Sequence, residues 1–189
     1  MASPKKQKKD APLTRYVALL RGVNVNGITI KSADLKALFV DELGFGAVRT
    51  VLASGNVLFD TDAPDAAALR TRIEQALRQC FGYEAWIVLL TQRQVADMAA
   101  GYPFERIDDT HHPCLVFGSD AAMLDEIMDK AGTVDAKVEQ LVRGDGVLYW
   151  QCPRGESLET PVAKLLAKTR YKSSTTTRNL RTVEKLITD

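Results

Sequence analysis

Apolar positions in the first ninety residues alternate between short continuous runs and helical repeats. The first run, Tyr16–Leu20, contains no polar side chain, which is typical of a strand covered on both faces. Residues 32–43 then place apolar side chains at helical spacing, with Ser32 as the expected N-cap and Gly44 as the expected terminating glycine. Two β-rich runs follow on either side of residues 54–56, whose Ser-Gly-Asn sequence indicates a hairpin.

A long amphipathic helix is the next predicted element, and it ends at Gly82. The apolar run Trp86–Leu90 follows it as a further buried strand. The order strand, helix, strand, strand, helix, strand is that of a split β-α-β unit, the ferredoxin-like arrangement. The predicted buried stripe of the long helix is Leu69, Ile73, Leu77 and Phe81.

The rest of the chain repeats this order after a short linking helix at residues 91–99. A buried strand at Cys114–Phe117 begins it, and Asn179 is the expected N-cap of a final helix. The hydroxyl-rich residues 173–177 indicate a flexible loop before that helix. The elements expected between them are a helix at 120–130 with Leu124 and Met128 inward, hairpin strands at 137–142 and 146–151, and a helix at 158–168.

Two successive patterns of this kind predict an α+β fold made of two ferredoxin-like halves that pack together, with mainly antiparallel sheets. We expect the first half to cover residues 14–90 and the second half, with the C-terminal helix, residues 91–189. Residues 1–13 have no apolar periodicity and are predicted to form a disordered basic tail.

Composition narrows the class of protein. Of the 189 residues, 46% are hydrophobic and 26% charged, which is ordinary for a soluble globular protein and suffices for a core without disulfides. The three cysteines form no CxxC pair, and no apolar run reaches the roughly 20 residues that a membrane helix needs. We therefore expect a cytoplasmic protein that does not enter a membrane, and the composition leaves its oligomeric state open.

Charge is unevenly distributed although the net charge is only +1. Residues 1–15 carry five basic side chains against one acidic one, and residues 161–189 carry seven against two. Clustered basic charge favours a polyanion or a phosphate as partner. A nucleotide or a nucleic acid is therefore the expected class of partner.

Several short motifs recur in a specific order. They are LRGVNVNG at 20–27 with Lys31, LGF at 43–45, SGNVLF at 54–59 and TTRNLRTVEKL at 176–186. In this combination the chain resembles an uncharacterised bacterial family, domain-of-unknown-function family 1697, over residues 14–187. The resemblance implies an α+β fold with two ferredoxin-like halves, and it implies no established reaction.

These motifs supply the candidate ligand-binding residues. An arginine can fork onto a phosphate, and amides and hydroxyls can donate beside it. For Arg21 the alternative is a pair with a buried acid, and for Ser54 and Asn56 it is ordinary turn chemistry. The candidates are Arg21, Asn24, Lys31, Ser54, Asn56, Thr177, Arg178, Asn179 and Lys185.

Two other groups of residues are weaker candidates for a binding site. Asp108, Asp109, His111, His112 and Cys114 are the metal-ligand residue types that occur together, but they lack the spacing of a metal site, so no metal and no cofactor is expected. Trp86 and the pair Tyr149 and Trp150 are interpreted as sheet residues rather than as a platform for stacking bases.

We therefore expect a protein that binds a phosphate-bearing ligand, either a nucleotide or a nucleic acid. Two alternatives remain open. One is a phosphoryl or nucleotidyl transferase that uses the same site. The other is a structural or protein-interaction module, in which the motif residues tie the two halves together. Burial of Arg21 and Arg178 with all their hydrogen bonds satisfied within the protein would favour the second alternative.

Overall fold

The architecture follows from a computed structural model that describes residues 12–23, 29–82, 84, 86–155 and 157–188. Most of the predicted tail and Asn24 lie outside the described residues. We call the part from β1 to β4 the N-terminal half. Its elements are β1 (Thr14–Leu20), α1 (Ser32–Ala37), a π-helical turn η1 (Leu38–Glu42), β2 (Gly46–Thr50), β3 (Asn56–Thr61), α2 (Ala66–Phe81) and β4 (Ile87–Thr91).

The C-terminal half runs from α3 to α7 and repeats the same strand order. Its elements are α3 (Gln92–Ala100), β5 (His111–Gly118), α4 (Ala121–Ala131), β6 (Gln140–Gly144), β7 (Val147–Pro153), α5 (Pro161–Ala167), α6 (Thr169–Lys172), β8 (Thr175–Asn179) and α7 (Leu180–Ile187).

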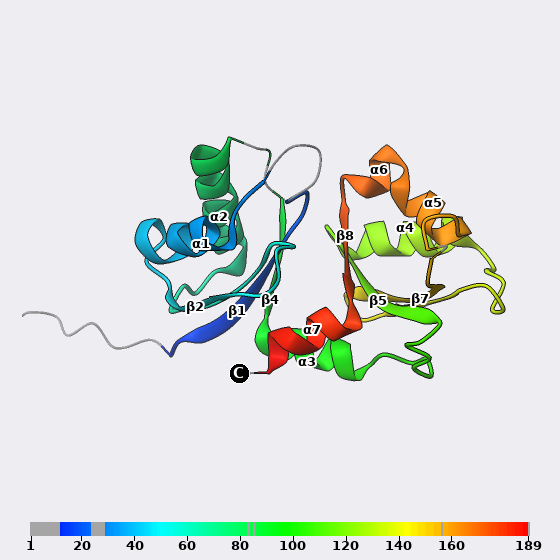
Figure 1. Ribbon diagram of the computed structural model, residues 1–189. Coiled ribbons are helices and arrows are strands. Elements are labelled where there is room, and N and C mark those ends of the chain that lie inside the picture. The colour runs from blue at the N-terminus through cyan, green and yellow to red at the C-terminus, as the bar shows by residue number, and fades with distance from the viewer. Residues whose placement is uncertain (1–11, 24–28, 83, 85, 156, 189) are drawn as a thin grey trace, which may run out of the picture.

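Each half contains a four-stranded antiparallel sheet (Figure 1). The orders are β2-β3-β1-β4 and β6-β7-β5-β8, so the strand connectivity is the same in both halves. The predicted α+β fold with two mainly antiparallel sheets is confirmed. None of the helices in the described part is both long and apolar enough to cross a membrane.

Strand β1 is buried on both faces, as its continuous apolar run predicts. Tyr16, Ala18 and Leu20 point to the core under α1 and α2, whereas Val17 and Leu19 point to a second core that lies between the two sheets. A fully buried side chain of this size contributes about 1.5–3 kcal/mol. The strand therefore stabilises both layers at once.

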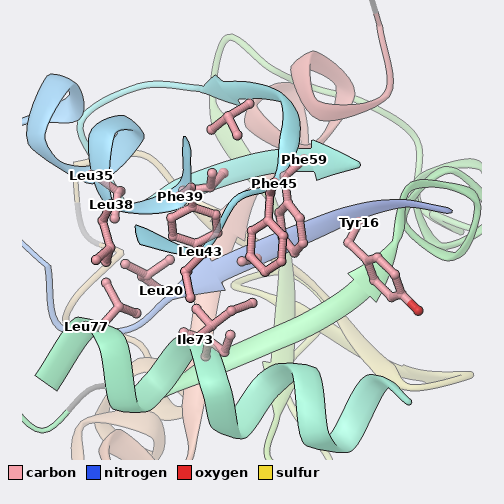
Figure 2. Packing of buried hydrophobic residues seen from close by; sticks show 14 of the residues in the cluster. Tyr16, Leu20, Leu35, Leu38, Phe39, Leu43, Phe45, Phe59, Ile73 and Leu77 are labelled. Atoms are coloured by element: carbon pink, nitrogen blue, oxygen red, sulfur yellow. The ribbon is translucent and has the colours of Figure 1, made fainter. Parts of the chain in front are cut away.

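The first core contains a cluster of three phenylalanines between the sheet and α2 (Figure 2). The rings of Phe45 and Phe59 stack at 4.5 Å between centroids, and Phe39 meets Phe59 edge-on at 5.3 Å. From α2, Ile73 and Leu77 close this core, and both are fully buried. The predicted helical stripe is thus confirmed at these two positions and at Leu69, and Phe81 is partly buried against the same core.

The core between the sheets joins the two halves. Leu58 comes from the first sheet, Phe117 from the second, and Val95 and Val183 from α3 and α7, which pack side by side. A third core packs the second sheet against α4 and α5, with Ile127 fully buried and Met128 only partly buried. Each sheet is thus covered on both faces along its centre: the first sheet by the first core and the core between the sheets, and the second sheet by the core between the sheets and the third core.

Several local predictions need correction. Residues 175–179, expected within a loop and at a cap, form the edge strand β8 against β5, because β-branched threonines suit an extended edge. Lys31, rather than Ser32, occupies the N-cap position of α1 without a side-chain cap. Helix α5 begins only at Pro161, with Thr160 as its cap. Asn179 does cap the final helix, as predicted.

Candidate functional site

Strand β8, which contains Arg178, lies at the junction of the two halves (Figure 1). Side chains alternate along a strand, so Thr176 and Arg178 share a face and Thr177 points the opposite way. In agreement, Thr176 and Arg178 are buried and Thr177 is exposed. The strand ends at Asn179, whose side chain accepts a hydrogen bond from the backbone N–H of Arg181 and so starts α7.

The guanidinium of Arg178 uses all its N–H donors within the protein. A guanidinium has five such donors in a fixed planar fork. Its Nε donates to Asn56 Oδ1 at 2.6 Å, and one terminal nitrogen donates to Thr176 Oγ1 at 2.7 Å and to the Thr177 carbonyl at 3.0 Å. The other terminal nitrogen donates to the carbonyls of Leu20 at 2.7 Å and Ser54 at 3.0 Å. One side chain thus joins β8 to the end of β1 and to the β2–β3 hairpin.

The β2–β3 hairpin holds Asn56 in the position at which it accepts the hydrogen bond from Arg178. Asn56 is completely buried, and its Nδ2 donates to the Val51 carbonyl and to Ser54 Oγ, both at 2.8 Å. Gly55 adopts φ +71°, and a Cβ there would lie 2.8 Å from the Cβ of Leu20. Only glycine therefore fits where the hairpin presses on the end of β1.

The positive charge of Arg178 has no counter-charge among its bonding partners. All five acceptors are neutral oxygens, and burial lowers the pKa of Arg178 to about 10. The Leu20 carbonyl that Arg178 contacts belongs to the peptide group that leads into Arg21. Arg21 is half-buried, and burial lowers its pKa as well. Neither arginine forms an ion pair with any residue that the structure describes.

Comparison with known proteins places the chain in a family. Residues 13–149 match the model of DUF1697, described as a protein of unknown function. The chain belongs to the DUF1697 family. The match ends before β8, so the motif at 176–186 lies beyond the matched residues.

A solved structure shares the fold of this DUF1697 chain. It is a conserved bacterial protein from Streptococcus pneumoniae, 24% identical, with a TM-score of 0.77 over 93% of this chain and 97% of that one. An unknown protein from Galdieria sulphuraria covers 93% of this chain and 88% of its own length at 11% identity, with a TM-score of only 0.28. None of the curated proteins matches the DUF1697 chain.

The structure brings some of the predicted site residues together and separates others. Ser54, Asn56 and Arg178 are directly bonded to one another, and Arg21 follows the bonded carbonyl of Leu20. The remaining described candidates lie outside this cluster. Thr177 contributes only its carbonyl, Asn179 caps α7, Lys31 is exposed at the start of α1, and Lys185 is exposed on α7 with its carbonyl bonded to Arg49.

The acidic segment before β5 takes part in a surface ion-pair network, whereas His111 and His112 are the first residues of β5 itself. Asp108 accepts hydrogen bonds from Arg106 at 2.8 Å and from Arg181 at 3.0 Å, and Arg106 also pairs with Glu184 at 2.6 Å. The bond from Arg106, followed by that from Arg181, lowers the pKa of Asp108. Within the described residues, no three His, Cys, Asp or Glu side chains are grouped so that they could hold a metal ion.

One buried polar tie was not predicted from the sequence. Glu139 is 1% exposed and accepts hydrogen bonds from Trp150 Nε1 at 2.8 Å and from the backbone N–H of Val162 at 3.0 Å. It thereby joins β7 to the first turn of α5. A glutamate in a polar stretch between Lys137 and Gln140 gives no sign of this burial, because its partners are distant in sequence. Trp150 and Tyr149 are buried sheet residues, as interpreted.

Proposed function

We propose that the protein binds a phosphate-bearing ligand, a nucleotide or a nucleic acid, at the end of β1 beside Arg178. The observation that carries the proposal is the buried guanidinium of Arg178 surrounded by neutral oxygens only. A charge removed from water without a counter-charge is costly, and a nearby anion reduces that cost. A second desolvated arginine, Arg21, lies next to this charge along the chain, because Arg178 bonds the carbonyl of the Leu20–Arg21 peptide group.

The two arginines have different roles in this proposal. Arg178 has no donor left for a ligand, so it acts through its charge and by fixing the hairpin against β1. Contact with the phosphate then belongs to Arg21, which can fork onto two phosphate oxygens. The Ser54 hydroxyl is exposed and accepts from Asn56, so its own O–H is directed elsewhere and can donate to the ligand.

The geometry supports binding more than phosphoryl or nucleotidyl transfer. A transferase needs a general base or metal-binding carboxylates close to the phosphate. The groups bonded to Arg178 are amide, hydroxyl and carbonyl oxygens, and none of them can serve as such a base at neutral pH. Arg178 is buried with all its donors satisfied inside the protein, which for this residue is the outcome that favours a structural tie. Arg21 does not meet that criterion, because it is only half-buried, and a structural tie gives no role to its desolvated charge.

The test is a fluorescence-anisotropy titration of a labelled single-stranded RNA, with ATP and inorganic pyrophosphate as competitors. The full chain carries serine in place of Lys5, Lys6, Lys8 and Lys9, because tail lysines bind any polyanion weakly. Arg21→Gln should weaken binding about 10–100-fold, as expected for the loss of a charge-assisted hydrogen bond of about 1.5–3 kcal/mol. The matched control is Arg93→Gln, an exposed arginine on α3.

A second variant tests the role of charge separately. Asn56→Asp places a carboxylate on the Nε of Arg178 and neutralises it, so ligand binding should weaken although Arg21 is intact. Because the variant also removes the two hydrogen bonds that Asn56 Nδ2 donates to Val51 and Ser54, binding is measured only after thermal unfolding has shown that the variant is folded. The proposal is wrong if the tail-substituted protein shows no saturable binding of RNA, ATP or pyrophosphate. It is also wrong if Arg21→Gln binds as tightly as Arg93→Gln.

A further inference from the structure

A cleft of about 410 Å³ separates the outer edge of β4 from the C-terminal half. Its floor is formed by Trp86 and the β4 residues 87–90. Its opposite wall is formed by the β5–α4 turn at residues 118–121 and by the β6–β7 turn at residues 145–146. This volume falls within the range of about 300–1,000 Å³ that ligand sites occupy. The cleft contains none of the residues of the proposed phosphate site, so it is a separate site.

The edge of β4 presents unused backbone groups to this cleft. In an antiparallel pair, opposite residues alternate between hydrogen-bonded and non-bonded positions. The N–H of Arg21 donates to the Trp86 carbonyl, and Ala18 lies opposite Leu89, three pairs further along. Leu89 is therefore at a non-bonded position, and its N–H and C=O point away from β1 into the cleft.

The neighbouring outward groups confirm this assignment, and they are already occupied. The N–H of Ile87 donates to Glu74 Oε1 at 3.1 Å, and the N–H of Thr91 donates to Gln94 Oε1 at 2.8 Å. For Leu89, no hydrogen bond to its outward N–H is present among the described residues. The protein thus closes both ends of the edge and leaves its centre open. An open edge of this kind is a template for another strand.

The charges around the cleft indicate what kind of strand fits. Asp97, Asp120 and Asp145 line it against the single basic residue Arg70. Half-buried apolar side chains flank the open amide, at Val88 and Leu90 on one face of the strand and Leu89 on the other. A segment with alternating apolar and basic residues matches both features, since strand addition gains affinity from the backbone and specificity from alternate side chains.

We propose that the cleft binds an extended segment of a partner protein, rich in alternating apolar and basic residues, as an added strand on β4. The occupant is a single strand rather than a second copy of this chain, because the two turns of the C-terminal half wall off the edge and leave room for one extended segment. The cleft would thus bind a protein partner, separately from the phosphate-bearing ligand proposed for the end of β1.

The first test measures amide hydrogen exchange in the full chain with a probe peptide of about nine residues that alternates lysine and valine, a length that exceeds an average strand. Saturating peptide should slow exchange of the Leu89 amide at least about tenfold, since it gains a partner in the complex. The amides of Val88 and Leu90 already face β1 and serve as internal controls. A peptide that alternates glutamate and valine should bind at least about tenfold more weakly, because it meets the acidic rim.

Two variants complete the test. Leu89→Pro removes the outward N–H without breaking a bond to β1, which an edge strand tolerates, and should abolish peptide binding. Asp97→Lys with Asp145→Lys should reverse the preference for the lysine peptide and covers the case in which the proline variant does not fold. Unchanged exchange at Leu89, equal affinity for both peptides, or a chain dimer that excludes the peptide would overturn the proposal.

Discussion

Replacement of Arg178 is the change that most directly tests how the two halves are held together. Arg178→Ala removes five hydrogen bonds, of which three join β8 to residues 122 to 158 positions earlier in the chain and two lie within β8. Two of the acceptors left behind are completely enclosed. Asn56 is 0% exposed and Leu20 is 1% exposed, so water cannot readily replace the lost donor.

The magnitude follows from opposing contributions. Each buried acceptor without a partner costs about 1–3 kcal/mol, so the two together cost about 2–6 kcal/mol. The lost methylenes of the side chain add about 2 kcal/mol. Removal of the buried charge acts in the opposite direction: burial lowers the pKa of Arg178 to about 10, which corresponds to about 3 kcal/mol. The alanine variant should therefore lose about 3 kcal/mol of unfolding free energy.

Arg178→Lys separates the effect of the buried charge from that of the hydrogen bonds. A lysine keeps the buried charge but has three donors instead of five, and its ammonium is more strongly hydrated. It should therefore be about as destabilising as alanine, although on a surface the same exchange is nearly neutral. Both free energies come from urea denaturation at neutral pH, followed by tryptophan fluorescence.

The control is Arg181→Ala, three residues along the chain, which removes an exposed ion pair with Asp108 and should cost less than about 1 kcal/mol. The reasoning fails if either Arg178 variant stays within about 1 kcal/mol of the parent. Such a result would mean that the apolar core between the sheets alone holds the halves together.

Three further predictions concern other parts of the fold. Gly55→Ala should lower the unfolding free energy by well over the roughly 1 kcal/mol expected of the control Gly82→Ala. Both glycines have positive φ, but only Gly55 lacks space for a Cβ, and thermal unfolding of the two variants compares them. The unfolding free energy should fall as the pH drops from 3.8, the ordinary pKa of an aspartate, through the lowered pKa of Asp108, because the ion-paired carboxylate is then protonated. Asp108→Asn should flatten that part of a profile of stability against pH. Glu139→Gln should cost about 1–3 kcal/mol in urea denaturation, because an amide can accept only one of the two hydrogen bonds from the donors of Trp150 and Val162.

Much of the fold could be predicted from the sequence because hydrophobic periodicity reports local burial. The run Tyr16–Leu20 and the stripe with Ile73 and Leu77 were predicted in the correct elements. Strand β8 was missed because Thr175, Thr176 and Thr177 are polar, and their extended form depends on pairing with β5. Such pairing is a tertiary effect that a local pattern does not contain.

The candidate site was predicted less completely. The motifs around Ser54 and Arg178 did identify residues that meet in space. The sequence could not show that Arg178 has all its donors satisfied inside the protein, because its acceptors are mostly backbone carbonyls, which every residue carries. Lys185 was included because it belongs to the motif at 176–186, and the contact it makes is through its carbonyl to Arg49.

The distance in sequence between Arg178 and its partners also has a consequence for biosynthesis. Arg178 emerges from the ribosome 122 residues after Asn56. At about 5–20 residues per second, the nascent N-terminal half waits about 6–24 s with the acceptors of its hairpin and of the β1 end unmatched. A polypeptide released before β8 is synthesised would expose these acceptors. Protein quality control in the cell could recognise them as a mark of an unfinished chain.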